Sequence, residues 1–483
     1  MSFENLFKQG NRPGPRNLIV MGFVFLLFLP DLDLFAISMS PATGLVSRIT
    51  GLDDMVISRV YIQLVAAFMG FCVLMNMGTL LRTPRHRVIV LGAGVLIGYA
   101  LVQLHFNGVA FREVLRLPPM IGIYLICMTA LASSCQCRYP LVLRDIGVGL
   151  LAAALIRLIY SGLMFARYGG TQIVEGVQSF AMDGSLLILW GFLAASAGIF
   201  AIRCLERKNR GLFVICLIIA GVLSIANALS YRRAAQIWIL LQFAGGSMLY
   251  FWLRRRLLLG VGIVAGVTAA IATAMISAAI VRFGINNAFE RLLSLTSNSD
   301  TKFGKSNDAF IDDWQAWKVV IAQTKFLGSG MGLDYGVVRL HDIEQYDRAF
   351  SDVIPLHTGT YELWASLGIL GALFHLLILV VLPIKCLMAC RNRSIEVQML
   401  AANCAAFILV VSLWPLAPPV TYSNQTAVLF GIVFGVLLAI TGKPNETTER
   451  SFEHQTTVPA TGYEQGGFAA APRTVGRYTR WKR

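Results

Sequence analysis

Long apolar stretches separated by short polar connections dominate this chain. The first runs from about Asn17 to Ser38, and the others begin near Val60, Val88, Pro119, Leu141, Ala181, Gly211, Ala234, Leu257, Gly359, Met399 and Asn424. Each stretch is about 20 residues long, the length that a helix needs to cross the hydrocarbon core of a bilayer. The pattern therefore predicts an all-α polytopic membrane protein with about twelve transmembrane helices.

The charge of the connections alternates along the chain. Every second connection is short and strongly basic, at residues 82–87, 138–144, 203–210, 254–256 and 385–393. By the positive-inside rule these connections should be cytoplasmic, which places both termini in the cytoplasm and the other connections outside. The formal net charge of +15 then reflects membrane topology, and we expect no nucleic acid as a partner.

One long polar stretch interrupts the apolar pattern and predicts an external loop that contains short helices. The domain organisation predicted from it is an N-terminal transmembrane region at 1–281 with about nine helices, the loop at 282–358 and about three further helices at 359–441. The remaining residues, 442–483, are rich in Thr, Glu, Gly, Ala and Pro and show no apolar period. They predict a disordered cytoplasmic tail.

Two sequence features of the loop are candidates for contacts with a substrate. Phe310, Trp314, Trp317 and Ile321 recur at helical spacing, which predicts a short amphipathic helix. Packing on the spans or at the membrane interface is its favoured role, and stacking of the Trp rings on sugar is the alternative.

The second feature is the G-x-G-x-G run of Gly328, Gly330 and Gly332. No βαβ unit surrounds it, so dinucleotide binding is disfavoured. A tight turn that brings the backbone close to a partner is the favoured interpretation. Presentation of backbone N–H groups to a phosphate is the alternative.

His357 lies where the loop returns to the membrane, within an aromatic-rich stretch. An imidazole with an unperturbed pKa of about 6.5 suits a general base at neutral pH, and a structural histidine is the alternative. His341 and the acidic residues near it are irregularly spaced, which disfavours a metal site. We therefore expect neither a metal nor another cofactor.

Four arginines are candidate phosphate ligands. Arg232 and Arg233 lie at an outward connection, where they could bind an anion or anchor at lipid headgroups. Arg157 lies within a predicted span, where a charge costs roughly 2.5 kcal/mol or more at the bilayer centre, so it should face the bundle interior or water. Arg291, like Arg282, stands at the loop entrance as either a substrate ligand or an interfacial anchor.

Together these features resemble the bacterial O-antigen polymerase and ligase superfamily. The resemblance rests on the topology, on an outward serine-arginine turn ending at Arg233, on the Trp helix and glycine turn, and on His357 followed by Tyr361 and the G-x-x-G of Gly368 and Gly371. The chain departs from the family pattern at Thr358, where the family has Asn, and at Ser366, where an acidic residue often stands.

The resemblance implies metal-independent glycosyl transfer from an undecaprenyl-pyrophosphate-linked glycan at the outer face of the bacterial inner membrane. His357 would take the proton of the acceptor hydroxyl, and guanidinium groups would stabilise the leaving pyrophosphate. The residues implied in pyrophosphate binding are Arg232, Arg233, Arg291 and Arg157, and those implied in substrate binding are Trp314, Trp317, Gly330, Gly332 and Tyr361.

The favoured reaction is polymerisation of lipid-linked repeat units into exopolysaccharide or O-antigen. Transfer of a finished glycan to lipid A core or another acceptor is the alternative within the family. A secondary transporter or flippase is the alternative from another class, disfavoured because the polar residues gather in one external loop. The partners implied are the lipid bilayer, a polysaccharide chain-length regulator and export proteins.

Overall fold

The computed structural model describes residues 21–22, 78, 81, 84–106, 142–168, 172–174, 177–179, 184–230, 233–286, 326–328, 359–413 and 424–441. Residues 1–441 form one compact unit, and residues 442–483 form a second. The predicted tail coincides with this second unit and lies outside the described residues.

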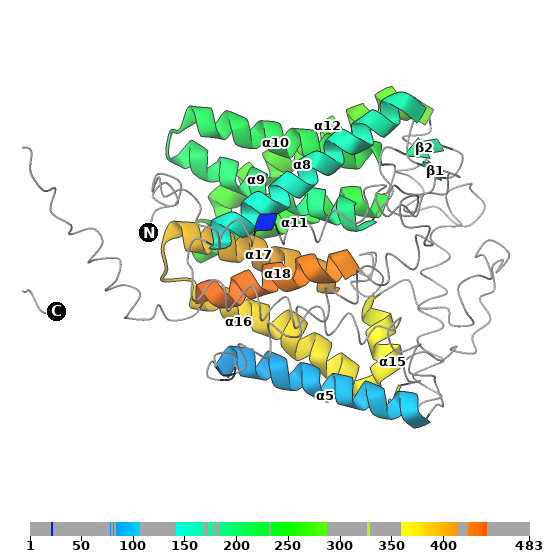
Figure 1. Ribbon diagram of the computed structural model, residues 1–483. Helices are drawn as coiled ribbons and strands as arrows, with labels where there is room; N and C mark the ends of the chain where they lie inside the picture. Colours follow the sequence, from blue (N-terminus) through cyan, green and yellow to red (C-terminus); the bar gives the residue numbers. More distant parts are fainter. Residues whose placement is uncertain are drawn as a thin grey trace, which may run out of the picture. The chain divides into compact units, whose positions relative to one another are not determined.

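Apolar helices build almost all of the described part of the first unit (Figure 1). A π-helix, η2 (His375–Val381), continues α15 into α16. The α-helices are α5 (Pro84–Phe106), α8 (Val142–Tyr168), α9 (Gly184–Glu206), α10 (Arg210–Leu229), α11 (Arg233–Leu253), α12 (Leu257–Phe283), α15 (Gly359–Phe374), α16 (Leu382–Ala389), α17 (Ile395–Leu413) and α18 (Asn424–Thr441).

Seven helical segments among the described residues are long and apolar enough to cross a membrane. They correspond to the apolar stretches predicted from Leu141, Ala181, Gly211, Ala234, Leu257, Gly359 and Met399. The stretches predicted from Val88 and Asn424 correspond to shorter apolar segments in α5 and α18. The other three lie almost entirely outside the described residues. A helical, multi-pass membrane protein is confirmed, and the total of about twelve spans stays a prediction.

Two short strands, β1 (Gln172–Val174) and β2 (Val177–Ser179), separate α8 from α9. They pair antiparallel, with Ile173 opposite Gln178 and Val174 opposite Val177. The apolar pattern predicts only helices, so this hairpin departs from the prediction. Its β-branched residues favour extended backbone, and the pairing satisfies backbone groups in a connection between two spans.

Close contacts between glycines and large aromatic rings hold the central helices together. A Cβ on Gly191 of α9 would lie 2.5 Å from the ring of Trp238 in α11, and one on Gly198 would lie 2.8 Å from the ring of Phe243. Trp238 also meets Phe407 of α17 edge to face, with ring centroids 5.5 Å apart. Because lipid supplies no hydrophobic force between helices, such close packing is what associates them.

A buried polar contact joins the same three helices. Asn403 of α17 donates from Nδ2 to Ser196 Oγ of α9 at 2.7 Å, and its Oδ1 accepts from Gln242 Nε2 of α11 at 3.5 Å. All three side chains are largely shielded, so an unpaired amide here would be costly. The contact therefore sets the register of α9, α11 and α17.

Candidate functional site

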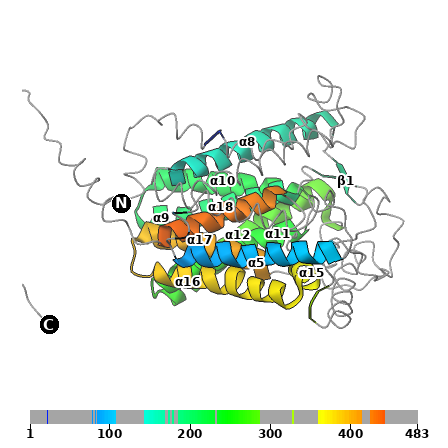
Figure 2. The ribbon, with the colours of Figure 1, turned by 60° about the horizontal axis from the view of Figure 1, so that its bottom comes forward.

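A break in α15 receives part of the long connection between α12 and α15. Gly368 leaves the helical conformation, with φ 57° and ψ −137°. The N–H of Ile369 donates to the carbonyl oxygen of Phe326 at 2.8 Å. A Cβ on Gly368 would overlap that oxygen. The break thus provides the space and the hydrogen-bond donor that the segment 326–328 uses. Helix α5 packs against α15 (Figure 2).

Helix α5 holds the same segment from a second direction. Tyr99 Oη donates to the Leu327 carbonyl oxygen at 2.6 Å, and Gln103 Nε2 donates to the same oxygen at 3.2 Å. The donors lie more than 200 residues earlier in the chain. Two successive carbonyls of the connection are therefore fixed by groups from two helices. We call this contact between Phe326–Gly328, Gly368 and α5 the loop anchor.

The loop anchor connects two of the glycine motifs that the sequence analysis singles out. Gly328, with φ 85°, is the first glycine of the G-x-G-x-G run, and Gly368 is the first of the G-x-x-G pair. The backbone nitrogen of Gly328 would lie 2.6 Å from a Cβ on Gly368. Residues 329–358 thus leave the anchor and rejoin the described chain at the start of α15.

The end of α10 is anchored at the connection that carries two of the candidate arginines. The side chain of Asn227 is completely buried and donates from Nδ2 to the Leu187 carbonyl oxygen of α9 at 2.8 Å. Ser230 Oγ donates to the carbonyl oxygen of Asn227 at 2.5 Å. The Ser230 bond engages a carbonyl in the last turn of α10, where a helix leaves its carbonyls without intrahelical partners, and the Asn227 bond ties this turn to α9.

The first turn of α11 is tied to the same end of α10. Gln236 Nε2 donates to the Ala228 carbonyl oxygen at 3.0 Å. Arg233 is the first residue of α11, and Arg232 lies outside the described residues. A helix N-terminus carries unpaired N–H groups and a partial positive charge. An anion at this connection would therefore meet the α11 terminus.

Arg157 lies within α8 and is only 5% exposed. This agrees with the expectation that an intramembrane arginine faces the bundle interior. Trp190 Nε1 of α9 donates to the Ala154 carbonyl oxygen at 3.1 Å, about one helical turn before Arg157. Nearer the end of α8, the Arg282 guanidinium of α12 stacks over Phe165, 4.6 Å from the ring centroid. Both contacts hold α8 against its neighbours.

Most of the other predicted site residues fall outside the described part of the chain. Tyr361 lies in the first turn of α15, which begins two residues after His357. The predicted site residues outside the described ranges are His357, Arg232, Arg291, Trp314, Trp317, Gly330 and Gly332. The proximity of these residues to one another and to Arg157 stays a prediction.

His375 is a buried titratable residue that the sequence analysis does not single out. It is 6% exposed, begins the π-helix and meets Trp364 edge to face, with ring centroids 5.9 Å apart. A histidine inside a long apolar run was a visible signal, because ionisable groups are rare in spans. Tyr99 and Gln103 gave no such signal, because their role depends on a distant backbone segment.

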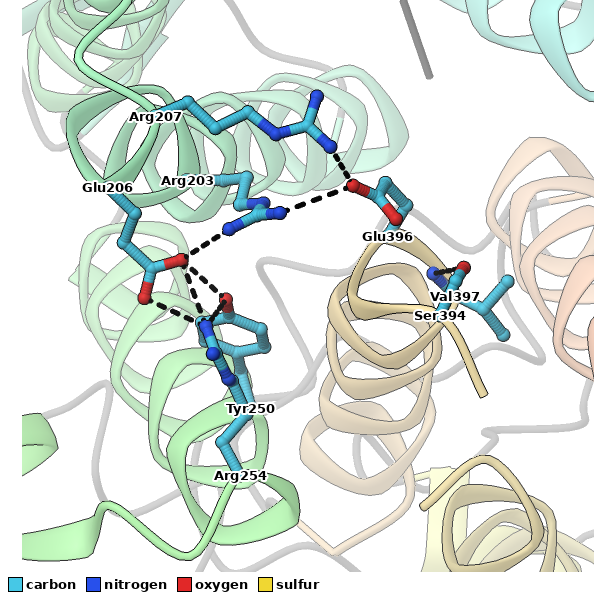
Figure 3. A network of polar contacts seen from close by, with 8 residues as sticks. All are labelled: Arg203, Glu206, Arg207, Tyr250, Arg254, Ser394, Glu396 and Val397. Atoms are coloured by element: carbon cyan, nitrogen blue, oxygen red, sulfur yellow. Dashed lines mark hydrogen bonds and ion pairs between the residues drawn. The ribbon is translucent and has the colours of Figure 1, made fainter. Parts of the chain in front are cut away.

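At the other end of α9, Glu206 gathers donors from α9 and α11 (Figure 3). Its carboxylate accepts from Arg203 at 2.9 Å, from Tyr250 Oη at 3.0 Å and from Arg254 at 3.1 Å. Burial by itself lowers the pKa of the Arg254 guanidinium, but the hydrogen bond to Tyr250 and the charge of Glu206 outweigh this and raise the pKa. Arg254, whose guanidinium stays charged in proteins, thus joins the ends of α9 and α11.

A second carboxylate links α17 to this group. Glu396, buried in the first turn of α17, pairs with Arg203 at 3.3 Å and with Arg207. Gln398 Nε2 donates to the Arg391 carbonyl oxygen at 2.6 Å, which fixes the connection between α16 and α17. Three connections that the charge pattern predicts to lie on one side of the membrane are thus joined at the ends of α9, α11 and α17 (Figure 3).

The described residues define a multi-pass α-helical membrane protein with polar anchors at the two ends of its central helices. No family model matches the chain, and a search of curated proteins also finds no match.

Proposed function

We propose that this chain is a glycosyltransferase of the bacterial inner membrane that polymerises undecaprenyl-pyrophosphate-linked repeat units at the periplasmic face. In the proposed topology about twelve helices cross the membrane and both termini are cytoplasmic. The observation that carries the proposal is the loop anchor, where Phe326–Gly328 meets the break at Gly368. It joins the glycine run of the long connection to the glycine pair that follows His357, two of the motifs that resemble the polymerase and ligase superfamily.

The proposed reaction is a single displacement at the anomeric carbon of the donor glycan. The acceptor hydroxyl oxygen forms the new glycosidic bond, and its proton passes to His357. The bond between the anomeric carbon and the pyrophosphate oxygen breaks, and undecaprenyl pyrophosphate leaves with the electron pair. The anomeric centre is inverted. Fixed guanidinium groups stabilise the charge that grows on the leaving group.

Two further observations support this assignment of roles. The connection that carries Arg232 and Arg233 is bounded by the hydrogen bonds of Asn227 and Gln236, so its two ends are held in place. Arg157 brings a cation into the bundle interior at a high energetic cost, which is typical of a functional residue in a membrane protein.

The test uses the purified full-length protein in detergent micelles, with lipid-linked repeats extracted from a strain that lacks it. The wild type should lengthen the glycan and release undecaprenyl pyrophosphate, and His357→Ala should lose this activity. His341→Ala is the matched control and should retain it. A substrate left chemically unchanged by the wild type would favour a transporter, and full activity of His357→Ala would overturn the assignment of the base.

The deletion strain separates polymerase from ligase. Single lipid-linked repeats should accumulate in it, as seen by gel and mass analysis of lipid-linked intermediates. Accumulation of long lipid-linked chains would contradict polymerisation and indicate transfer to another acceptor.

A further inference from the structure

The ion-paired ends of α9, α11 and α17 support a strongly basic surface. Its residues belong to the connections 207–210, 254–256 and 390–394, which we call the basic platform. Glu206 and Glu396 cross-link these connections through Arg203, Arg207 and Arg254 (Figure 3). Because the cross-links join three helices, the connections are held as one unit.

The cross-links leave most of the charge of the basic platform exposed. Five of its cations are exposed and form no ion pair within the part of the chain that the structure describes: Lys208, Arg210, Arg255, Arg256 and Arg391. Within the described ranges, the acidic residues that pair with the platform are Glu206 and Glu396, and both are already occupied by arginines. The platform thus presents a surplus of positive charge that can receive an anion.

The backbone at two of these cations is one that usually favours glycine. Lys208 and Arg255 have φ 57° and φ 56°, and each follows the end of a helix. Glycine takes such positions without a steric penalty, whereas a residue with a Cβ is disfavoured there. The chain therefore carries a cation at two positions where glycine would be less strained.

Exposed apolar side chains lie directly beside the exposed cations. Arg256 is followed by Leu257 and Leu258, and the latter is 92% exposed. Leu205, also exposed, precedes the connection that holds Lys208. A cation next to an apolar side chain matches the boundary between phospholipid headgroups and acyl chains. There the cation meets phosphate, and the apolar side chain meets hydrocarbon.

We propose that the basic platform binds the headgroups of anionic phospholipids in the leaflet at that end of the helices. The phosphate and the net negative charge of the lipid meet Lys208, Arg255 and Arg256, and the acyl chains cover Leu257 and Leu258. A free phosphate would satisfy the cations alone and would leave these leucines uncovered. The exposed cations and the exposed leucines together therefore favour a lipid over a free phosphate. This inference does not depend on the proposed glycosyl transfer.

The test is a lipid titration of the purified full-length protein in detergent micelles, with bound lipid counted by native mass spectrometry. Phosphatidylglycerol is the anionic probe and phosphatidylcholine the zwitterionic one. We expect the wild type to retain phosphatidylglycerol preferentially. The variant Lys208→Gln/Arg255→Gln/Arg256→Gln should bind it at least about tenfold more weakly, because each cation near a lipid surface contributes measurably to binding.

Lys302→Gln/Lys305→Gln/Arg348→Gln is the control, since it removes the same charge from the long connection and should bind as the wild type does. Thermal unfolding without added lipid should be unchanged in both variants, which excludes misfolding. Equal retention of the two lipids, or undiminished phosphatidylglycerol binding by the platform variant, would overturn the proposal. Competition by millimolar inorganic phosphate that removes all bound lipid would also overturn it, because the site would then select only a free anion.

Discussion

The carbonyl oxygen of Phe326 occupies the space that a side chain on residue 368 would fill, and Gly368 leaves that space open. The same break leaves the N–H of Ile369 available, and that group bonds the Phe326 oxygen at 2.8 Å. An unpaired N–H at this point of a membrane helix would be costly. The break in α15 and the docked connection therefore stabilise each other.

Gly368→Ala should destabilise the protein by roughly 2 kcal/mol or more, because the new Cβ meets backbone atoms and φ lies in a region unfavourable for alanine. The measurement is the unfolding free energy in mixed micelles.

Gly98→Ala of α5 is the control for this change, because no atom lies within 4 Å of the added Cβ. It should leave stability unchanged or slightly raised, since alanine is the better helix former. Equal stability of the two variants would show that the contact between Gly368 and Phe326 does not form.

Removing both α5 donors should release the loop anchor. In Tyr99→Phe/Gln103→Leu the Leu327 carbonyl loses two hydrogen bonds, each worth about 1 kcal/mol. Hydrogen exchange by mass spectrometry should then show faster exchange at the amide of Ile369, whose N–H donates to the Phe326 carbonyl oxygen in the loop anchor.

Each single variant should give a smaller increase, because the other donor remains. The peptide at the end of α10, held by Asn227 and Ser230, should exchange at the wild-type rate and serves as the internal control. Unchanged exchange at Ile369 in the double variant would mean that α5 does not hold the segment 326–328.

Glu396 and Arg207 should be coupled energetically. Glu396→Gln removes the charge that pairs with Arg207, whereas Arg203 retains Glu206 as a second partner. A double-mutant cycle of Glu396→Gln with Arg207→Gln should give a coupling energy of about 1 kcal/mol in the unfolding free energy. The same cycle with Lys208→Gln should give a value near zero. Similar couplings in both cycles would attribute the effect to net charge alone.

Arg157 should be important for activity if the proposed function holds. Arg157→Gln keeps hydrogen-bonding capacity but removes the charge, and should lower kcat for glycan polymerisation by roughly tenfold or more. Arg167→Gln removes an exposed cation from the same helix and should be near neutral. Wild-type turnover in Arg157→Gln would restrict the role of Arg157 to helix packing.

The long apolar runs determined the helical, membrane-spanning class, because a span must satisfy its backbone internally and be apolar over about 20 residues. The alternating charge also anticipated which connections share one end, and Glu206 and Glu396 join three of these. The short hairpin at Gln172–Ser179 was missed, because a few residues carry too weak a pattern to compete with the neighbouring spans.

What the tertiary structure alone decided is which distant groups meet. From sequence, Gly368 was one glycine of a motif and Tyr99 one polar residue of an apolar run. Both residues have their roles because the backbone of Phe326–Gly328 contacts Gly368 and accepts a hydrogen bond from Tyr99. Backbone carbonyls are chemically alike at every residue, so no side-chain pattern identifies the one that will be bound. The apolar period determined the spans, and only the packing of α5 against α15 decided where the connection docks.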